Sequence, residues 1–181
     1  MIEKELKVLI DEELYNMLLS QFTWDKQVTQ INHYYIDEQK ILAEKNISVR
    51  VRHIDNQYLL QIKRPILIDK GLHIKDEYEE ELSDITKLVT SEKLRTITGK
   101  NIGDARLAGN LTTERHICHW DEYTTVCLDK NRYLGIVDYE LEIEYSYELD
   151  QDLQRSLIRA NVNFDGSTRG KYSRFTNRLN G

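Results

Sequence analysis

The chain has 181 residues, of which 40% are hydrophobic and 31% are charged, and its formal net charge at neutral pH is −6. This length suits a single domain, which we expect to span residues 1–181, and the acidic balance predicts no nucleic-acid partner. We expect a cytoplasmic protein without a membrane partner, because no stretch has the length and apolarity of a membrane span or a secretion signal.

Apolar and charged residues alternate with a period of two through the first half of the chain, which predicts antiparallel strands. The predicted strands cover residues 2–8, 31–37, 48–53, 58–65 and 73–82. Helical spacing of apolar residues predicts a first helix that follows Asp11 as its N-cap, and a second over residues 84–94 with Asp84 as its cap. The only proline, Pro65, closes the fourth strand.

The second half repeats this pattern. A hairpin is predicted from residues 111–120 and 123–129, then a turn at Gly135 and a strand over residues 137–145. A helix follows near residues 149–160, and residues 168–175 are predicted to be a final strand or loop. Cys118 and Cys127 flank the hairpin. A disulfide between them is conceivable, but two reduced thiols are favoured because no secretion signal is present.

The charges on these strands separate by sign. Glu140, Glu142 and Glu144 share one face of a strand, about 7 Å apart, whereas Arg50 and Arg52 share the face of another. One interpretation is an ordinary solvated face of an antiparallel sheet. The other is a sheet that curls so that the charges meet inside. In that case carboxylates suit a divalent metal, and arginine and lysine suit phosphate oxygens.

The opening stretch I-E-K-E-L-K-V resembles the E-x-E-x-K motif of the CYTH superfamily, the triphosphate tunnel metalloenzymes. Further motifs of that family follow in order over nearly the whole chain. They are N-H-Y-Y-I-D, R-V-R at Arg50 and Arg52, Q-I-K ending at Lys63, E-Y-E-E-E with Glu79 and Glu81, Arg115, C-L-D ending at Asp129, E-L-E at Glu140 and Glu142, and G-K-Y-S-R with Lys171.

This resemblance implies an α+β fold: a closed antiparallel eight-stranded β-barrel with a charged tunnel through its centre and helices packed outside. It also implies roles for individual residues. The implied metal ligands for Mg²⁺ or Mn²⁺ are Glu3, Glu5, Asp129, Glu140 and Glu142. The implied triphosphate contacts are Lys7, Arg50, Arg52, Lys63, Arg115 and Lys171. The implied catalytic residues are Glu5, Glu79, Glu81, Lys63 and Tyr35, of which Tyr35 would stand beside the tunnel and help the leaving group.

One position departs from the family pattern. Many members carry a lysine two residues before the arginine of the later hairpin, where this chain has Thr113. One tunnel cation is therefore missing or replaced. Glu144 and Asp138 continue the acidic face beyond the motif, and we expect them at the rim. Parity places His73 and His119 on the inner face, where a structural or surface role is favoured.

The resemblance favours a metal-dependent triphosphatase that removes the terminal phosphoryl group of inorganic tripolyphosphate, and in a wider reading that of nucleoside triphosphates. A thiamine triphosphatase is an alternative that needs an aromatic wall, which Trp24 or Trp120 could supply. A class IV adenylate cyclase and a non-catalytic polyphosphate or nucleotide binder are the others. The expected partner is a small triphosphate, and the apolar helix near Leu149, Leu153 and Leu157 leaves a homodimer open.

Overall fold

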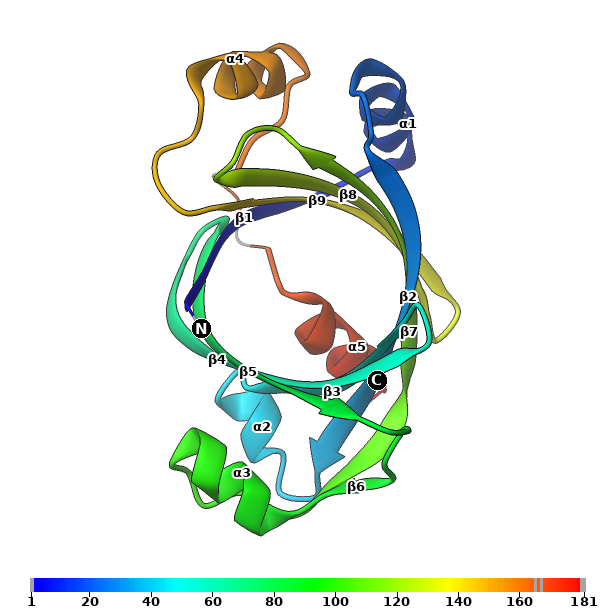
Figure 1. Cartoon of the computed structure of the whole chain (residues 1–181), viewed down its shortest axis with the longest axis vertical. Coiled ribbons are helices and arrows are strands. Elements are labelled where there is room, and N and C mark those ends of the chain that lie inside the picture. Colours follow the sequence, from blue (N-terminus) through cyan, green and yellow to red (C-terminus); the bar gives the residue numbers. More distant parts are fainter. Residues whose placement is uncertain (1, 165, 167, 180–181) are drawn as a thin grey trace.

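The computed structural model describes residues 2–164, 166 and 168–179. Eight antiparallel strands close into a barrel in the ring order β2-β3-β4-β5-β1-β9-β8-β7, because β2 also pairs with β7. Figure 1 shows these strands as a ring, and the predicted closed eight-stranded barrel is confirmed. The strands are β1 (Ile2–Ile10), β2 (Lys26–Asp37), β3 (Ser48–Ile54), β4 (Gln57–Asp69), β5 (Leu72–Leu82), β7 (Ala105–His119), β8 (Thr124–Tyr133) and β9 (Ile136–Tyr145). A two-residue strand, β6 (Leu88–Val89), pairs with β7.

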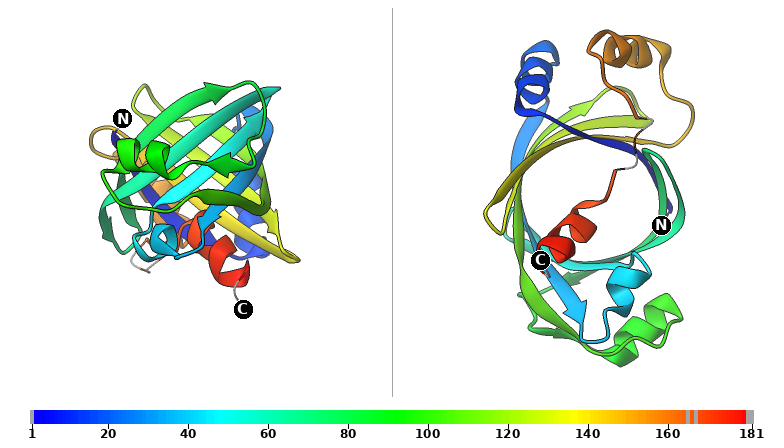
Figure 2. Two further views of the ribbon diagram at one scale, coloured as in Figure 1. Left: turned by 90° about the horizontal axis from the view of Figure 1, so that it is seen from below. Right: turned by 180° about the vertical axis from the view of Figure 1, so that it is seen from behind.

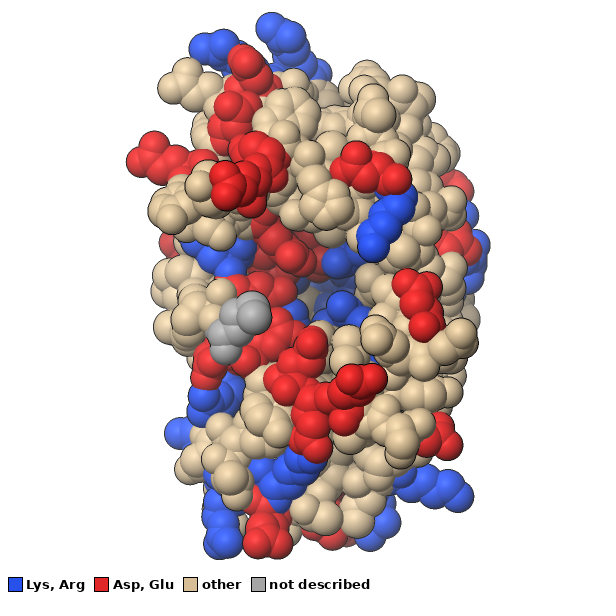
Figure 3. Space-filling model, viewed as in Figure 1, with Lys and Arg blue, Asp and Glu red and all other residues tan. Residues whose placement is uncertain are grey.

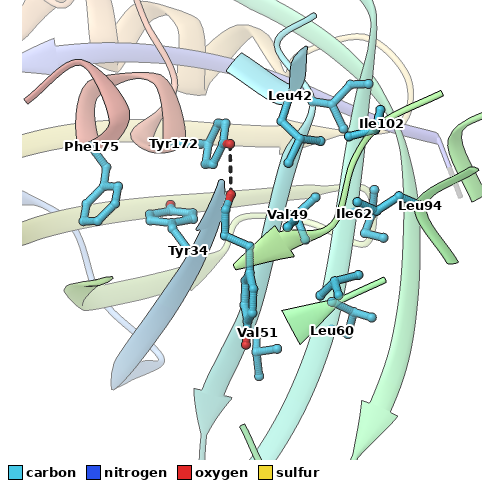
Figure 4. Close-up of a cluster of buried hydrophobic side chains, with 14 of the residues drawn as sticks. Tyr34, Leu42, Val49, Val51, Leu60, Ile62, Leu94, Ile102, Tyr172 and Phe175 are labelled. Carbon is cyan, nitrogen blue, oxygen red and sulfur yellow. Dashed lines mark hydrogen bonds between the residues drawn. The ribbon is translucent and has the colours of Figure 1, made fainter. Parts of the chain in front are cut away.

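The barrel is apolar outside and charged inside. On β1, Glu5 and Lys7 are buried and line the interior, whereas Leu6 and Val8 pack outward against an apolar cluster. On β3, Val49 and Val51 likewise lie in an outer cluster. Figure 4 shows part of that cluster, with Val49, Leu60 and Ile62 projecting from neighbouring strands. The curled sheet with its charges inside is therefore the arrangement that the chain adopts.

Helices cover the outer apolar faces. Figure 1 places α1 (Glu12–Gln21) and α4 (Gln151–Arg159) over β8 and β9, while α2 (Ile41–Glu44) and α3 (Ser91–Thr98) lie on the opposite side of the barrel. The predicted cap of α1 is confirmed, since the Asp11 carboxylate accepts a hydrogen bond from the Leu14 amide at 2.8 Å. None of the helices in the described part of the chain has the length and apolarity needed to cross a membrane.

Two predicted elements are wrong. The helix expected over residues 84–94 begins only at Ser91, where the Thr90 hydroxyl accepts from the Lys93 amide as the cap. Before it, Leu88 and Val89 pair with β7 as β6, because that pairing buries Val89 in the outer core. In addition, β4 does not end at Pro65 but continues through a bulge to Asp69.

The second error concerns the end of the chain, where residues predicted as a strand or loop form the helix α5 (Lys171–Leu179). Figure 2 shows this helix at one end of the barrel, and Figure 1 shows it within the outline of the ring. Phe175 is fully buried and packs on Tyr34 with ring centroids 5.1 Å apart. Gly109, at φ +152°, allows this close approach, since a Cβ there would lie 3.0 Å from the Phe175 ring. The helix α5 therefore closes one end of the interior.

Both cysteines are free thiols, as favoured from the sequence. On the β7–β8 ladder Cys127 faces Ile117 while Cys118 faces Val126, so the two side chains do not oppose each other. Burial raises the pKa of Cys127 to about 12, so its thiol is neutral and inert at neutral pH.

Candidate active site

A charged cavity of about 280 Å³ occupies the barrel interior. Side chains of β1, β2, β3, β4, β5, β7 and β9 line it, together with the first turn of α5. Figure 3 shows the hollow from one end, with basic groups within and acidic groups around them. A cavity of this size suits a short, strongly charged ligand better than a large apolar one.

Two arginines on β3 face the cavity without a carboxylate partner among the described contacts. Arg50 donates from Nε to the Gln61 side chain at 2.8 Å, and Arg52 donates from Nε to the Asn32 side chain at 3.1 Å. Burial, with Arg50 and Arg115 nearby, lowers the pKa of Arg52 to about 9, which leaves it charged at neutral pH. Charged guanidinium groups held by neutral amides are prepared to bind an anion.

On the β1 wall, three carboxylates bring ligand oxygens within 4.8 Å of one another: Glu3, Glu5 and Glu144. Burial, opposed by Arg115 and assisted by Glu142 and Glu3, raises the pKa of Glu144. The nearest printed cation contact of Glu144 is Arg115 at 3.9 Å. This triplet is therefore crowded with negative charge and accessible from the cavity.

Lysines balance the other two members of that triplet. Lys63 Nζ lies 2.6 Å from one Glu3 oxygen and 2.7 Å from the other. Glu5 contacts Lys75 as well as Lys7, the latter at 2.7 Å. Burial alone would raise the pKa of Glu5, but Lys7 and Lys75 hold it well below its usual value. The wall is thus a layer of carboxylates interleaved with ammonium groups.

A second acidic triplet lies deeper, next to α5, and consists of Asp129, Glu140 and Glu142. Lys171 Nζ is within 2.9 Å of an oxygen of each member. Arg115 forms a two-pronged pair with Asp129 at 2.8 and 2.7 Å and also contacts Glu142. Burial would lower the pKa of Lys171, but the surrounding carboxylates keep this ammonium charged. This triplet therefore already encloses a cation of the chain itself.

The position of the missing lysine is filled by a neutral network. The Thr113 hydroxyl donates to Asn131 Oδ1 at 2.7 Å, and Asn131 Nδ2 donates to Asp138 at 2.9 Å. Arg174 of α5 closes the network with contacts to Asp138 at 3.0 Å and to Glu140 at 2.8 Å. Asp138 therefore does not stand at the rim as expected but fastens α5 to the barrel.

Most of the residues expected at the site meet at this cavity or directly beneath it. Those that do are Glu3, Glu5, Lys7, Arg50, Arg52, Lys63, Arg115, Asp129, Glu140, Glu142 and Lys171. Glu79 and Glu81 lie on an exposed stretch of β5, where Glu79 accepts a hydrogen bond from Gln61 at 2.6 Å. These two acids stand apart from both triplets.

Tyr35 does not stand beside the tunnel, and that expectation is wrong. A bulge between Tyr34 and Tyr35 on β2 turns Tyr34 toward the cavity and buries Tyr35 in the outer core. The Tyr35 hydroxyl donates to the Thr86 carbonyl oxygen, on the outer side of the barrel. Simple alternation could not predict this exchange, because a bulge adds one residue to the strand.

Two further charged or polar side chains of β5, His73 and Lys75, line the cavity without having been assigned a role from the motifs. Their signal was the parity that they share with Glu77. Burial, followed by Lys7 and Lys75, lowers the pKa of His73 to about 4, so this imidazole is neutral. His119 instead lies on the surface, paired with Asp25 at 2.9 Å.

Both tryptophans lie on the outer face of the barrel. Trp24 and Trp120 pack against the cluster under α1 and α4, each within about 6 Å of the Phe22 ring. Neither indole borders the interior cavity. The aromatic wall that a thiamine group would require is therefore not supplied by these residues.

The residues of the cavity fit a hard divalent cation. Carboxylate oxygens are the ligands that Mg²⁺ and Mn²⁺ prefer, and three converge in each triplet. Of the two, the triplet of Glu3, Glu5 and Glu144 is the better fit, because it borders the cavity and its charge is incompletely balanced. In the deeper triplet the Lys171 ammonium takes the place that a metal would need.

Comparison with known proteins agrees with this geometry. The sequence profile of the CYTH domain matches residues 1–175. YjbK, a candidate triphosphatase of Bacillus subtilis (strain 168), is 30% identical over 154 residues, which cover 79% of this chain and 77% of YjbK.

Solved structures give the same answer. A candidate adenylate cyclase of Bacillus halodurans is 25% identical, with a TM-score of 0.71 over 94% of this chain and 95% of that one. HpAC1 of Hippeastrum, a candidate adenylyl cyclase described with a dominant triphosphatase activity, superposes with a TM-score of 0.75 at 20% identity, over 97% of this chain and 95% of that one. The fold is shared across bacterial and plant proteins of very different sequence.

Proposed function

Since the chain belongs to the CYTH domain family, we propose that it is a metal-dependent triphosphatase that removes the terminal phosphoryl group of inorganic tripolyphosphate, with nucleoside triphosphates as a second substrate class. The observation that carries this proposal is the pair of Arg50 and Arg52. Both guanidinium groups face a closed cavity and contact only neutral amides. Burying such charges is costly, so their natural partner is an anion that enters the cavity.

The walls of the cavity suggest how the substrate lies. Arginines from β3 and β7 face lysines and carboxylates of β1, β4 and β5, with the cavity between them. A phosphate chain placed there would contact guanidinium forks on one side and ammonium groups on the other. Arg115 is already fixed by Asp129, so it offers a rigid donor instead of a mobile one.

We assign the metal to Glu3, Glu5 and Glu144, in the form of Mg²⁺ or Mn²⁺. When bound, such an ion neutralises the charge that develops on phosphate oxygens and orients water. The residues of the chain itself position the substrate and exclude bulk water. Wall carboxylates accept hydrogen bonds from the attacking water, the water oxygen bonds to the terminal phosphorus, and the bridging P–O bond breaks to release phosphate and pyrophosphate.

Glu79 and Glu81 would then act at the entrance, not at the reacting atoms. Glu79 is linked through Gln61 to Arg50, so it positions that arginine by a chain of two hydrogen bonds. Asp129, Glu140 and Glu142 would hold Lys171 and Arg115 in place. Their role in binding a metal directly is the weaker assignment, because Lys171 occupies their centre.

The test is phosphate release from tripolyphosphate, ATP, thiamine triphosphate and longer polyphosphate, each with Mg²⁺ or Mn²⁺. The proposal expects the highest rate with tripolyphosphate and none after chelation. Formation of cyclic AMP and pyrophosphate from ATP would assign the chain to the cyclases. Tight binding of tripolyphosphate without any product would make it a polyphosphate-binding module.

A further inference from the structure

Glu5 is shared between two ammonium groups on the β1 wall. Lys7 and Lys75 both contact its Oε1 atom, Lys7 at 2.7 Å. Lys7 has a second carboxylate, Glu142, at 3.2 Å. Among the ion pairs of the described residues, Lys75 has Glu5 alone. Lys75 therefore depends on one carboxylate that it does not own.

Lys75 is also placed to reach a ligand. Its side chain is 18% exposed and lines the cavity, whereas the side chain of Lys7 is only 3% exposed. In the ring of strands, β5 stands four steps from β7 in either direction, so Lys75 faces the wall of Thr113 and Arg115 across the barrel. A phosphate chain between these walls lies within the range of a long, flexible lysine.

The same carboxylate belongs to the triplet that fits a divalent cation. A doubly charged ion on Glu5 repels an ammonium group bound to the same carboxylate, because both lie within a few ångströms in a site with little water. Lys7 retains Glu142 in that event, but Lys75 loses its one partner. The phosphate chain then becomes the nearest anion available to Lys75.

We propose that Lys75 is a substrate-binding residue that Glu5 holds in reserve until a divalent cation occupies Glu5, whereupon its ammonium group moves to the phosphate chain. The proposal rests on the proposed function and deepens it. Metal and triphosphate binding are thereby coupled, since each favours the arrangement in which Lys75 has left Glu5. A lysine that simply contacts phosphate at all times would give no such coupling.

The experiment compares Lys75→Met with wild type in three measurements. With Mg²⁺ present, loss of a charge-assisted contact raises the KM for tripolyphosphate roughly ten- to a hundred-fold. Without substrate, Mn²⁺ binds the variant several-fold more tightly, as measured by electron paramagnetic resonance of free Mn²⁺, because no lysine competes for Glu5. In the presence of EDTA, calorimetry shows tripolyphosphate affinities within about three-fold of each other, because Lys75 is still held by Glu5 in wild type.

Lys4→Met is the matched control. It removes the same charge from the outer face of β1, where Lys4 lies over the Tyr145 ring at 4.2 Å. Neither its Mn²⁺ affinity nor its KM changes by more than two-fold. Lys75→Arg retains the charge and is used if the methionine variant does not fold. It keeps the competition with Mn²⁺, so its metal affinity stays at the wild-type value.

An unchanged KM, an unchanged or weaker Mn²⁺ affinity, or an equal loss of tripolyphosphate affinity with and without metal each overturns the proposal. Absence of phosphate release by wild type overturns the proposed function instead. In that case the Mn²⁺ measurement still decides whether Lys75 competes for Glu5. The two failures are therefore distinguishable.

Discussion

Replacement of Arg52 by methionine should separate binding from stability. The folded chain gives this guanidinium one hydrogen bond, to the neutral Asn32 side chain at 3.1 Å, and places it near two other arginines. Loss of that bond costs about 1 kcal/mol, and relief of the repulsion offsets it, so we expect a Tm within a few degrees of wild type. Substrate loses charge-assisted contacts of about 1.5–3 kcal/mol each, so kcat/KM falls roughly ten- to a hundred-fold or more.

Arg174→Met supplies the contrast within the same barrel. Arg174 contacts Asp138 at 3.0 Å and Glu140 at 2.8 Å, and Glu140 is fully buried. Breaking a buried pair costs about 3–5 kcal/mol, which lowers Tm by roughly 6–20 °C in a chain of this size. Thermal melts and phosphate release on both variants measure the difference. If Arg52→Met melts as early as Arg174→Met, or keeps its kcat/KM within two-fold, Arg52 is not an unpaired anion-binding group.

Four further results are expected. Chelation with EDTA abolishes phosphate release, and added Mn²⁺ restores it; retained activity in EDTA would contradict the metal assignment. Burial would raise the pKa of Glu140, but Lys171 and Arg174 lower it to about 2, so about 3 kcal/mol of stability is present above pH 4.5 and is lost as the pH falls toward 2, as melts across that range will test. Because the pKa of Glu144 is raised, Glu144→Gln raises Tm slightly at pH 7 while it weakens Mn²⁺ binding about ten-fold; tighter binding would exclude Glu144 as a ligand. Tyr35→Phe leaves kcat within two-fold and lowers stability by about 1 kcal/mol, since its hydroxyl bonds only outside the barrel; a large loss of kcat would restore Tyr35 to the site.

The barrel was predictable because its strands alternate so regularly. On β1, β3 and β9 the residues of one parity are charged and those of the other are apolar, and this pattern fixes which face each side chain takes. The prediction failed where regularity was interrupted. The bulge after Tyr34 is a local backbone event that leaves no mark on the pattern of residue types.

The end of the chain failed for a different reason. Short length and a charged composition hid the helix α5, although Tyr172, Phe175, Thr176 and Leu179 recur at helical spacing. That spacing was the available signal. What no pattern could show is the docking of this helix inside the barrel outline, because it depends on Gly109 and on the acidic triplet that receives Lys171. Such contacts join residues from distant parts of the sequence.

The two acidic triplets explain how one barrel can be both stable and receptive. The deeper triplet is neutralised by Lys171, Arg115 and Arg174, so its charges fasten α5 to the barrel and need nothing from solution. Nearer the cavity, Glu144 has no close cation, and Arg52 has no carboxylate. Positive and negative groups are thus left incompletely paired on facing walls, and a metal–triphosphate complex satisfies both at once, since it presents cationic and anionic surfaces together. A metal alone, or a phosphate chain alone, would satisfy only one wall, which is why we expect the two to bind best as a pair.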